Sequence, residues 1–411
     1  MEARMDDQRA RTHPRRVLCN VTCRAPQLSW TETVLRWQDG GKTRSGRRSV
    51  NAIVTAMAPL PLSIWIRDAS RPLPFPLREP GCRLFARARH GLWHGLMAAS
   101  LKPGDEVLVP AYHHGSEIEA LVRAGARCRF YEANETLEPD EAELGRLLER
   151  RTRALHLTHF LGFPQDAARW RAWCDERGLL LIEDAAQAWL AERDGRPVGS
   201  DGDLAIYCLY KTFGLPDGAA LLSRLPLTTR GARRRLAAGS LGLEHAAWLL
   251  ARSSLLSQIA KRVPREQRYS AARDFALGEP ASTPSTATLL ALPRVACAEA
   301  AAQRRYNYGQ LLRVMSALVP SAFRRIPAGA SPFVLPIATI EKPEMLRRLR
   351  ARGIRPLDFW SIPHPALPVD EFPGAAALRA SIIGLPVHQE LRSSDLQLIV
   401  AIFRDEYRAA V

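Results

Sequence analysis

The sequence predicts an α/β fold built around an open, mainly parallel sheet. Short runs that have the length of strands occur at residues 106–110, 127–131, 154–158 and 179–183, and the first of them (EVLVP) has the apolar character of a buried strand. Stretches with a helical spacing of apolar residues separate these runs. A chain that alternates strands and helices in this way forms parallel β-α-β units, and the ligands of such folds lie at the carboxyl ends of the strands.

The expected helices of this region have recognisable ends. The first one spans residues 86–101 and stops at Lys102-Pro103-Gly104, because proline and glycine both interrupt helices. The other expected elements of the region are helices at 116–124, 139–150 and 166–177 and strands at 205–210 and 219–223.

Three regions are expected along the chain. Residues 1–57 mix arginine with serine, threonine and isolated tryptophans, and predict a poorly ordered, Arg-rich extension. Residues 58–287 are expected to form the large domain, in which the stretch after residue 225 has no clear assignment. Residues 288–411 are expected to form a linking helix and a smaller α+β domain. Its expected elements are a long helix at 289–318, a strand at 333–339 and helices at 343–352 and 396–407.

The composition is that of an ordinary globular protein. Of the 411 residues, 46% are hydrophobic and 24% are charged, and no apolar run is long enough to span a membrane. The N-terminus lacks the apolar segment of a secretory signal. The seven cysteines show no paired CxxC spacing, so we expect free thiols in a cytoplasmic protein and no metal site.

The formal net charge of +16 suggests anionic partners. A basic surface attracts anionic substrates such as nucleotides and phosphates, and it is also the electrostatic signature of a nucleic-acid-binding protein. No nucleic-acid-binding motif accompanies the charge. We therefore expect small-molecule substrates and no nucleic acid, and we retain nucleic-acid binding as the less favoured alternative.

A carboxylate follows one of the buried strands. The run Leu179-Leu-Leu-Ile-Glu places Asp184 at the carboxyl end of a strand, where a ligand crevice is expected. A buried carboxylate requires a partner, and a cationic ring nitrogen would supply one. The alternative is a structural aspartate that caps the next helix.

A lysine follows a second strand. The run Leu204-Ala-Ile-Tyr-Cys-Leu-Tyr leads to Lys211, and an amine that is partly desolvated at such a strand end has a lowered pKa and can attack an aldehyde. Taken alone, Lys211 could be a surface lysine. Together, Lys211 and Asp184 supply the amine and the acid that pyridoxal 5′-phosphate (PLP) requires, one for the imine and one for the pyridine nitrogen.

From about Arg83 to Leu222, with a weaker likeness to Leu391, the chain resembles the DegT/DnrJ/StrS family of PLP-dependent sugar aminotransferases. The order and spacing of many short blocks carry this resemblance. These blocks are 102–110 (KPGDEVLVP), 159–164 (HFLGFP), 182–187 (IEDAAQ), 198–203 (VGSDGD), Lys211 with Asp217-Gly218, 304–308 (RRYNY) and 385–389 (LPVHQ).

The resemblance implies a role for each of several residues. Lys211 would carry the cofactor as a Schiff base, Asp184 would pair with the pyridine nitrogen, and Gln187 would hydrogen-bond the ring hydroxyl. The helix from Arg87 would point its N-terminus at the cofactor phosphate. The family also implies the fold-type-I transferase architecture and a homodimer with active sites at the subunit interface.

The sequence departs from the family pattern in the cofactor site. Ala88-Arg89 stands where a Gly-Thr pair usually opens the phosphate-binding helix. Arg89 could bind phosphate through its guanidinium group, and the alternative is that it is an exposed arginine. Cys208 stands where many members have a phosphate-binding serine. Among Tyr112, His113 and His114, the last is expected by its position to stack on the cofactor ring. His159 is expected to be a structural, hydrogen-bonded histidine, and the alternative is that it approaches the cofactor.

The resemblance implies an aminotransferase that transfers an amino group to a carbonyl of a sugar-like, nucleotide-linked substrate. An amino donor such as glutamate would load the cofactor, and Lys211 would shuttle a proton. The alternative within the same chemistry is a degenerate or altered-reaction member of the family, since Cys208, Arg89 and a missing Asn-Tyr-Arg motif before the long helix depart from the pattern.

Overall fold

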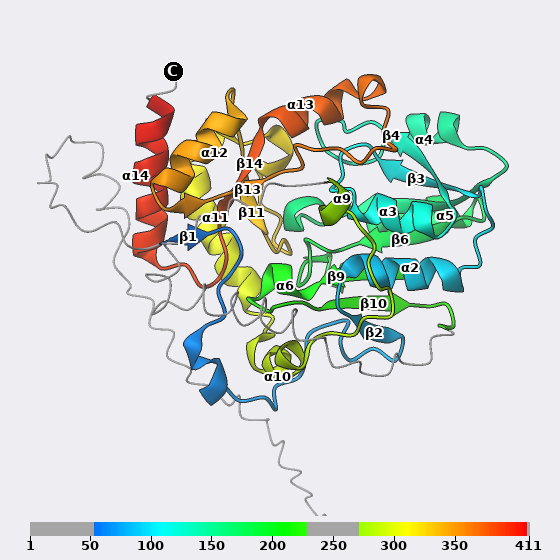
Figure 1. The fold of residues 1–411 in the computed structure, drawn as a ribbon, viewed down its shortest axis with the longest axis horizontal. Coiled ribbons are helices and arrows are strands. Elements are labelled where there is room, and N and C mark those ends of the chain that lie inside the picture. Colours follow the sequence, from blue (N-terminus) through cyan, green and yellow to red (C-terminus); the bar gives the residue numbers. More distant parts are fainter. Residues whose placement is uncertain (1–52, 228–270, 409–411) are drawn as a thin grey trace, which may run out of the picture. The chain divides into compact units, whose positions relative to one another are not determined.

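Seven strands form the central sheet of the protein, in the order β2-β10-β9-β6-β5-β3-β4 (Figure 1). In chain order they are β2 (Cys82–Phe85), β3 (Glu106–Pro110), β4 (Arg127–Tyr131), β5 (Thr152–Thr158), β6 (Leu180–Asp184), β9 (Leu204–Cys208) and β10 (Ala219–Ser223). The strands from β9 to β4 pair in parallel, and β10 is antiparallel to both β9 and β2. The expected mainly parallel sheet is therefore confirmed.

The computed structural model describes residues 53–227 and 271–408. Most of the extension predicted at residues 1–57 lies outside the described residues. Strand β1 (Val54–Thr55) falls within it and pairs in parallel with β12 (Ile354–Arg355). The central part of the stretch after residue 225 is also outside the described residues. No helix in the described ranges combines the length and apolar character needed to cross a membrane.

Helices cover both faces of the sheet. Their bounds are α2 (Ala88–Ala98), α3 (Ser116–Arg123), α4 (Glu141–Leu147) and α5 (Ala167–Asp175). Side chains alternate along each strand, so Ala154 and Ile182 face the apolar layer beneath α2 and α3. Their neighbours Leu155 and Leu181 face the layer that Trp170 fills from α5. This three-layer arrangement buries the sheet and leaves its carboxyl edge for a ligand.

The predicted long helix at 289–318 is wrong, because the structure has two helices there. Helix α10 (Thr286–Val295) begins at Ser285, whose hydroxyl accepts a hydrogen bond from the Thr288 amide, and it contains Pro293. Proline removes one helical hydrogen bond and crowds the preceding turn. The chain becomes extended at Ala296, and α11 (Ala300–Met315) starts after this break.

A small antiparallel sheet, in the order β11-β14-β13, forms the core of the C-terminal part. Its strands are β11 (Val334–Ala338), β14 (Ile382–Pro386) and β13 (Leu357–Asp358), and its helices are α12 (Lys342–Ala351), α13 (Pro373–Ser381) and α14 (Ser393–Arg408). The strand and the two helices predicted for this part agree with β11, α12 and α14. Helix α13 and strand β14 were not predicted.

Candidate active site

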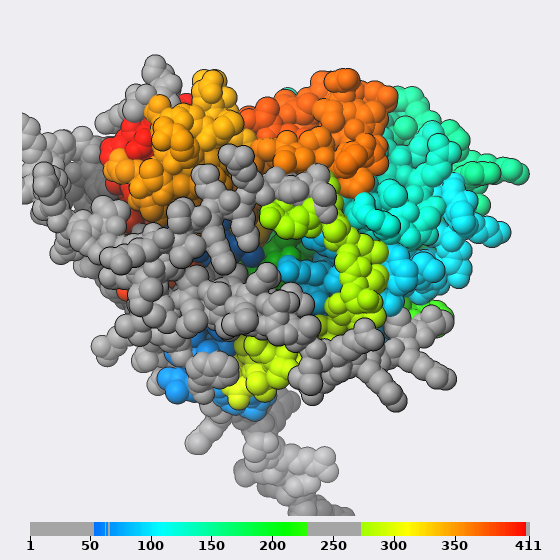
Figure 2. Space-filling view, viewed as in Figure 1, coloured from blue at the N-terminus to red at the C-terminus, as the bar shows by residue number. Residues whose placement is uncertain are grey.

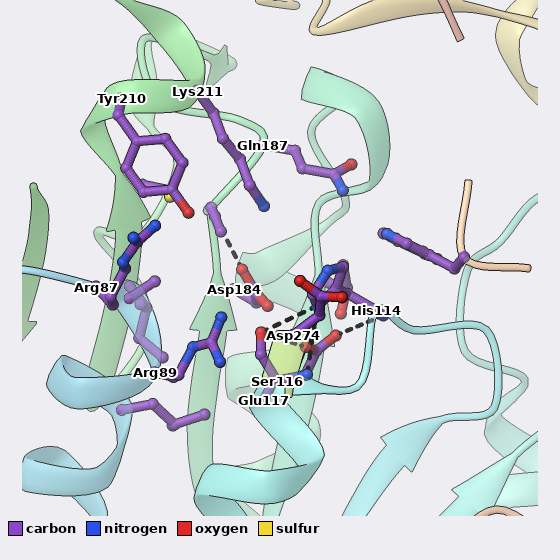
Figure 3. Close-up of a pocket in the computed structure, with 17 residues that line it drawn as sticks. Arg87, Arg89, His114, Ser116, Glu117, Asp184, Gln187, Tyr210, Lys211 and Asp274 are labelled. Atoms are coloured by element: carbon purple, nitrogen blue, oxygen red, sulfur yellow. Dashed lines mark hydrogen bonds between the residues drawn. The ribbon is translucent and has the colours of Figure 1, made fainter. Parts of the chain in front are cut away.

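A cavity of about 240 Å³ lies at the carboxyl ends of the parallel strands (Figure 3). In the close-up, Lys211 and Gln187 point into it from one side, Asp184 lies at its centre, and Arg87 and Arg89 approach from α2. Its wall also includes Ala88, His114 and Cys208. The structure therefore brings together every residue that the sequence singled out for a cofactor.

Asp184 ends β6 with its side chain in the cavity. Its Oδ1 accepts a hydrogen bond from the Ala186 amide at 2.8 Å. Burial raises the pKa of Asp184, while His156 and Lys211 act in the opposite direction and Glu117 adds to the rise. A cation bound in the cavity would favour the ionised form of this carboxylate.

Lys211 lies on a short helical turn, α6 (Leu209–Thr212), directly after β9. The predicted strand 205–210 is thus too long, since β9 ends at Cys208. The expected fall in the pKa of Lys211 is also wrong. Burial lowers this pKa, but Cys208, Tyr210 and the carboxylates Asp184 and Glu117 together raise it above its ordinary value. The amine is therefore protonated near neutral pH when the cavity holds only protein groups.

Gln187 is held in the cavity wall by the backbone. Its Oε1 accepts a hydrogen bond from the Leu161 amide at 2.8 Å, and the side chain is buried. Leu161 belongs to the short 3₁₀ turn η2 (Phe160–Gly162) and has a left-handed φ of 56°. With its oxygen occupied, Gln187 has its amide nitrogen available to donate to a ligand.

The N-terminus of α2 opens toward the cavity without a side-chain cap. The first amides of a helix have no partner inside the helix, so they are available to an anion. Arg89 lines the cavity, and its Nη1 also donates to the Ala276 carbonyl at 2.6 Å. Arg87 lies beside it, with its guanidinium group 5.5 Å from the ring centre of Tyr210. Sequence analysis did not identify Arg87 or Tyr210 as site residues.

The segment after α9 (Ala271–Asp274) runs along α2, and Asp274 at the end of α9 lines the cavity. The carbonyls of Ala276, Leu277 and Pro280 accept or share hydrogen bonds with Arg89, His90 and His94 in turn. Figure 2 shows this segment in yellow-green as a ridge across the visible face. Because the segment is distant in sequence from α2, its part in the site could not be read from local patterns.

Among the three aromatic candidates after β3, only His114 lines the cavity. Its backbone amide donates to Glu117 Oε1 at 2.9 Å, and burial lowers the pKa of the ring to about 4. His113 bonds to the Pro110 carbonyl at 2.9 Å and stacks on Phe130. Of the three rings, that of His114 is therefore the one that faces the cavity. Trp360 and Glu117 line the cavity as well, and sequence analysis did not identify Glu117.

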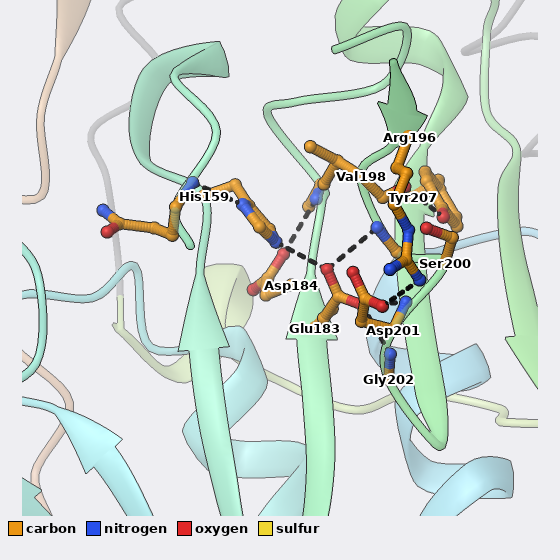
Figure 4. A network of polar contacts seen from close by, with 12 residues as sticks. His159, Glu183, Asp184, Arg196, Val198, Ser200, Asp201, Gly202 and Tyr207 are labelled. Carbon is orange, nitrogen blue, oxygen red and sulfur yellow. Dashed lines mark hydrogen bonds and ion pairs between the residues drawn. The ribbon is translucent and has the colours of Figure 1, made fainter. Parts of the chain in front are cut away.

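A buried carboxylate network supports the strand ends from the opposite face of the sheet (Figure 4). Glu183 Oε2 accepts hydrogen bonds from His159 Nε2 and the Gly199 amide, both at 2.9 Å, and Oε1 accepts from the Asp201 amide at 2.9 Å. His159 Nδ1 accepts from the Gln165 amide at 3.0 Å. Both ring nitrogens of His159 are thus bonded within the fold, which agrees with the expected structural histidine.

These residues fit PLP. An open helix N-terminus beside two guanidinium groups suits a phosphate, since charge-assisted hydrogen bonds to phosphate are strong. A carboxylate at Asp184 suits a protonated ring nitrogen, and the amine of Lys211 faces the same cavity. The Cys208 thiol has a pKa raised by burial, so it remains neutral and does not repel an anion.

The sheet, the small C-terminal domain and the lysine-aspartate pair together have the architecture of fold-type-I PLP-dependent transferases. A putative sugar aminotransferase from Streptococcus pneumoniae, in its PLP-form, has the same fold with a TM-score of 0.59. The likeness covers 81% of this chain and 88% of that chain at 16% identity. At this identity it shows the fold alone, and the predicted fold class is confirmed.

Residues 84–245 match the sequence model of the DegT/DnrJ/EryC1/StrS aminotransferase family, which confirms the predicted resemblance over this region. The GDP-perosamine synthase of Vibrio cholerae is 31% identical over 131 residues, which are 31% of this chain and 36% of that protein. The dTDP-4-dehydro-2,3,6-trideoxy-D-glucose 4-aminotransferase of Saccharopolyspora spinosa is 32% identical over 137 residues, which are 33% of this chain and 36% of that protein. The chain thus matches little more than a third of the length of these relatives.

Proposed function

We propose that the protein is a PLP-dependent aminotransferase that acts on a carbonyl group of a sugar-like, nucleotide-linked substrate. The observation that supports the proposal is that three functional groups face the same cavity. The Lys211 amine, the Asp184 carboxylate and the open N-terminus of α2 all face it. This combination is otherwise hard to explain, because each group is costly to bury without a ligand.

The cofactor, when bound, supplies an electron sink that stabilises negative charge at the substrate carbon next to nitrogen. The remaining work belongs to protein groups. Asp184 holds a proton on the ring nitrogen, and Gln187 donates its amide N–H to the ring hydroxyl. Arg87, Arg89 and the first amides of α2 hold the phosphate. His114 and Cys208 complete the wall around the ring.

Lys211 is the general base and acid of the proposed reaction. Its Nζ would carry a proton between the substrate carbon and the bound cofactor. The Lys211 pKa is raised above its ordinary value once Cys208, Tyr210 and the two carboxylates have offset the effect of burial. The amine must lose a proton before it can attack an aldehyde, so cofactor attachment is expected to accelerate as pH rises.

The proposed substrate class rests on the relatives. One of the matched proteins is named for a GDP-linked sugar and another for a dTDP-linked sugar. The positive charge of the chain suits a phosphorylated substrate. An amino donor such as glutamate completes the proposed transfer, and a homodimer in the cytoplasm is the proposed working form.

An absorption spectrum with added PLP tests the proposal. The wild-type protein is expected to give a visible band that Lys211→Ala lacks, followed by amination of nucleotide-linked keto sugars by the wild type alone. Lys102→Ala is the matched control, since Lys102 is an exposed lysine at the end of the α2 region and outside the cavity. A band that survives in Lys211→Ala, or no band in the wild type at saturating PLP, would contradict the proposal.

A further inference from the structure

His156 is a buried histidine that the proposed function does not use. It lies on β5, two residues before the cavity-lining Thr158, and therefore on the same face of the sheet. In the parallel pair of β5 with β6, His156 is opposite Ile182 and Thr158 is opposite Asp184. The imidazole of His156 is therefore next to the Asp184 carboxylate on this face of the sheet, two residues further from the carboxyl ends of the strands.

The ring of His156 has no conventional partner. Its side chain is 1% exposed, and neither Nδ1 nor Nε2 forms a hydrogen bond with any of the described residues. The nearest charged atom is Asp184 Oδ2, 3.8 Å from Nε2. A buried polar group without a hydrogen bond is expensive, and so this arrangement calls for an explanation.

His159, three residues further along the chain, provides a comparison, because it is a histidine with a structural role. One of its nitrogens is bonded to Glu183 and the other to the Gln165 amide. His156 has neither kind of anchor. Its surroundings are otherwise apolar, since Ala154 and Ile182 belong to the core layer beneath α2 and α3.

Two carboxylates interact electrostatically with the His156 ring. Asp184 approaches from β6, and Glu117 acts on it from α3. Glu117 already accepts hydrogen bonds from the amides of His114 and Gly115, which hold it at the start of its own helix. Within the described residues, the Asp184 side chain accepts a hydrogen bond from the Ala186 amide on Oδ1, and Oδ2 lies 3.8 Å from His156 Nε2.

We propose that His156 is a positioning residue that keeps the Asp184 carboxylate ionised and oriented toward the ring nitrogen of the cofactor. A proton on Nε2 attracts Oδ2 across 3.8 Å, and because the His156 side chain is 1% exposed, solvent screens this attraction less than it would at the surface. The direction of its influence on Asp184, a lowering of that pKa against burial, agrees with this role. The inference rests on the proposed function, because it acts on the cofactor contact of Asp184.

Binding of two cofactor forms to His156→Phe tests the inference without any turnover. One form is PLP, and the other is 1-deaza-PLP, in which a carbon replaces the ring nitrogen. His156→Phe is expected to raise the dissociation constant of PLP about tenfold and to leave that of the deaza form unchanged. His156→Gln retains an N–H donor and is expected to bind PLP within about threefold of the wild type.

Tyr131→Phe is the matched control. Tyr131 donates its hydroxyl hydrogen to the His156 carbonyl at 3.1 Å, so its loss disturbs the same strand without touching the ring. It is expected to leave both dissociation constants unchanged. An equal loss of affinity for both cofactor forms in His156→Phe, or no loss for either, would overturn the inference while the proposed function stood. A wild-type protein that binds neither PLP nor 1-deaza-PLP would overturn both the inference and the proposed function.

Discussion

Arg304 donates a hydrogen bond from Nη2 to the carbonyl of Thr212, the residue that follows Lys211, over 2.6 Å. Its Nη1 donates to the Pro332 carbonyl at 3.1 Å and its Nε to Gln389 Oε1 at 2.8 Å. Gln389 in turn donates to the same Thr212 carbonyl at 3.1 Å. Helix α11 and the segment after β14 therefore hold the turn that carries the proposed catalytic lysine.

Arg304→Met is expected to destabilise the protein by about 3 kcal/mol, because it leaves several buried acceptors without donors. Burial lowers the pKa of Arg304 to about 9, which reflects how completely the group is enclosed. The free energy of unfolding from urea titration measures the effect. PLP binding should weaken as well, since the Lys211 turn loses its anchor.

Arg305→Met is the control for this prediction. Arg305 is the next residue of α11 and makes a single hydrogen bond, from Nη1 to the Ala330 carbonyl at 2.7 Å. Its loss is expected to cost less than about 1 kcal/mol. Equal stabilities of the two variants would show that the contacts of Arg304 with Thr212 and Gln389 do not anchor the turn.

Arg87 is expected to bind the phosphate of the cofactor more directly than Arg89, whose guanidinium group is already engaged with the Ala276 carbonyl. The guanidinium group of Arg87 lies over the Tyr210 ring, and Arg87 is the residue at the N-terminus of α2. Arg87→Met should therefore raise the dissociation constant of PLP by about 10- to 100-fold. Pyridoxal, which lacks the phosphate, should bind the variant and the wild type alike in a competition assay.

Arg83→Met serves as the comparison for Arg87. Arg83 is an exposed arginine of β2, and its Nη1 donates to the carbonyls of Pro80 and Cys82 outside the cavity. Arg83→Met should leave the dissociation constants of PLP and of pyridoxal unchanged. If Arg87→Met weakened pyridoxal as much as PLP, the residue would not act on the phosphate.

Much of this site was accessible from the sequence because it depends on local order. Asp184 follows an apolar run that is a strand in the structure, and Lys211 follows another, so the parallel sheet brings both to one edge. Gln187 was identified because it ends a short block, 182–187, that resembles the family. The pairing of Arg304 with Thr212 was not accessible, although its motif was recognised, because the partner is remote in the sequence.

The errors have a common physical origin. The predicted long helix is interrupted at Ala296, three residues after Pro293, which itself lies inside α10. The pKa of Lys211 rises because Cys208, Tyr210, Asp184 and Glu117 together outweigh burial, and Glu117 comes from α3. Strand length and helical spacing are local properties. Charge balance in a cavity depends on which elements meet there.

His90 on α2 predicts a loss of stability in mild acid. Burial lowers its pKa to about 4, and its Nε2 shares a hydrogen bond of 2.8 Å with the Leu277 carbonyl. Between about pH 6.5 and pH 4, His90 binds a proton in the unfolded chain but stays neutral in the folded protein. The free energy of unfolding therefore falls as pH falls. The change is about 1.4 kcal/mol for each unit of pKa difference.

His90→Gln is expected to flatten this part of the pH profile of stability. Glutamine can donate to the same carbonyl but does not take up a proton in this range. The comparison is His94→Gln, one turn along α2, where a less enclosed ring has a smaller fall in pKa and bonds to the Pro280 carbonyl. Parallel profiles for the wild type and His90→Gln between pH 4 and pH 7 would contradict the prediction.

Glu183→Gln is expected to destabilise the fold by about 2–4 kcal/mol, since a glutamine presents a donor where Glu183 only accepts. Burial raises the pKa of Glu183, but the hydrogen bonds from His159, Gly199 and Gly202 lower it below its ordinary value overall. The carboxylate therefore stabilises the protein above the pKa it has in the unfolded chain. This stabilisation is lost as pH falls through the lower pKa of the folded state.

Urea unfolding at pH 7 measures the cost, with Glu176→Gln as the matched variant. Glu176 is a mostly exposed carboxylate that pairs with Arg177 at 3.0 Å, and its change should cost less than about 1 kcal/mol. Because Glu183 adjoins Asp184 on β6, the loss of its network should also loosen the strand end and weaken PLP binding. A Glu183→Gln protein as stable as Glu176→Gln would mean that the loop of Gly199 and Asp201 does not depend on the carboxylate.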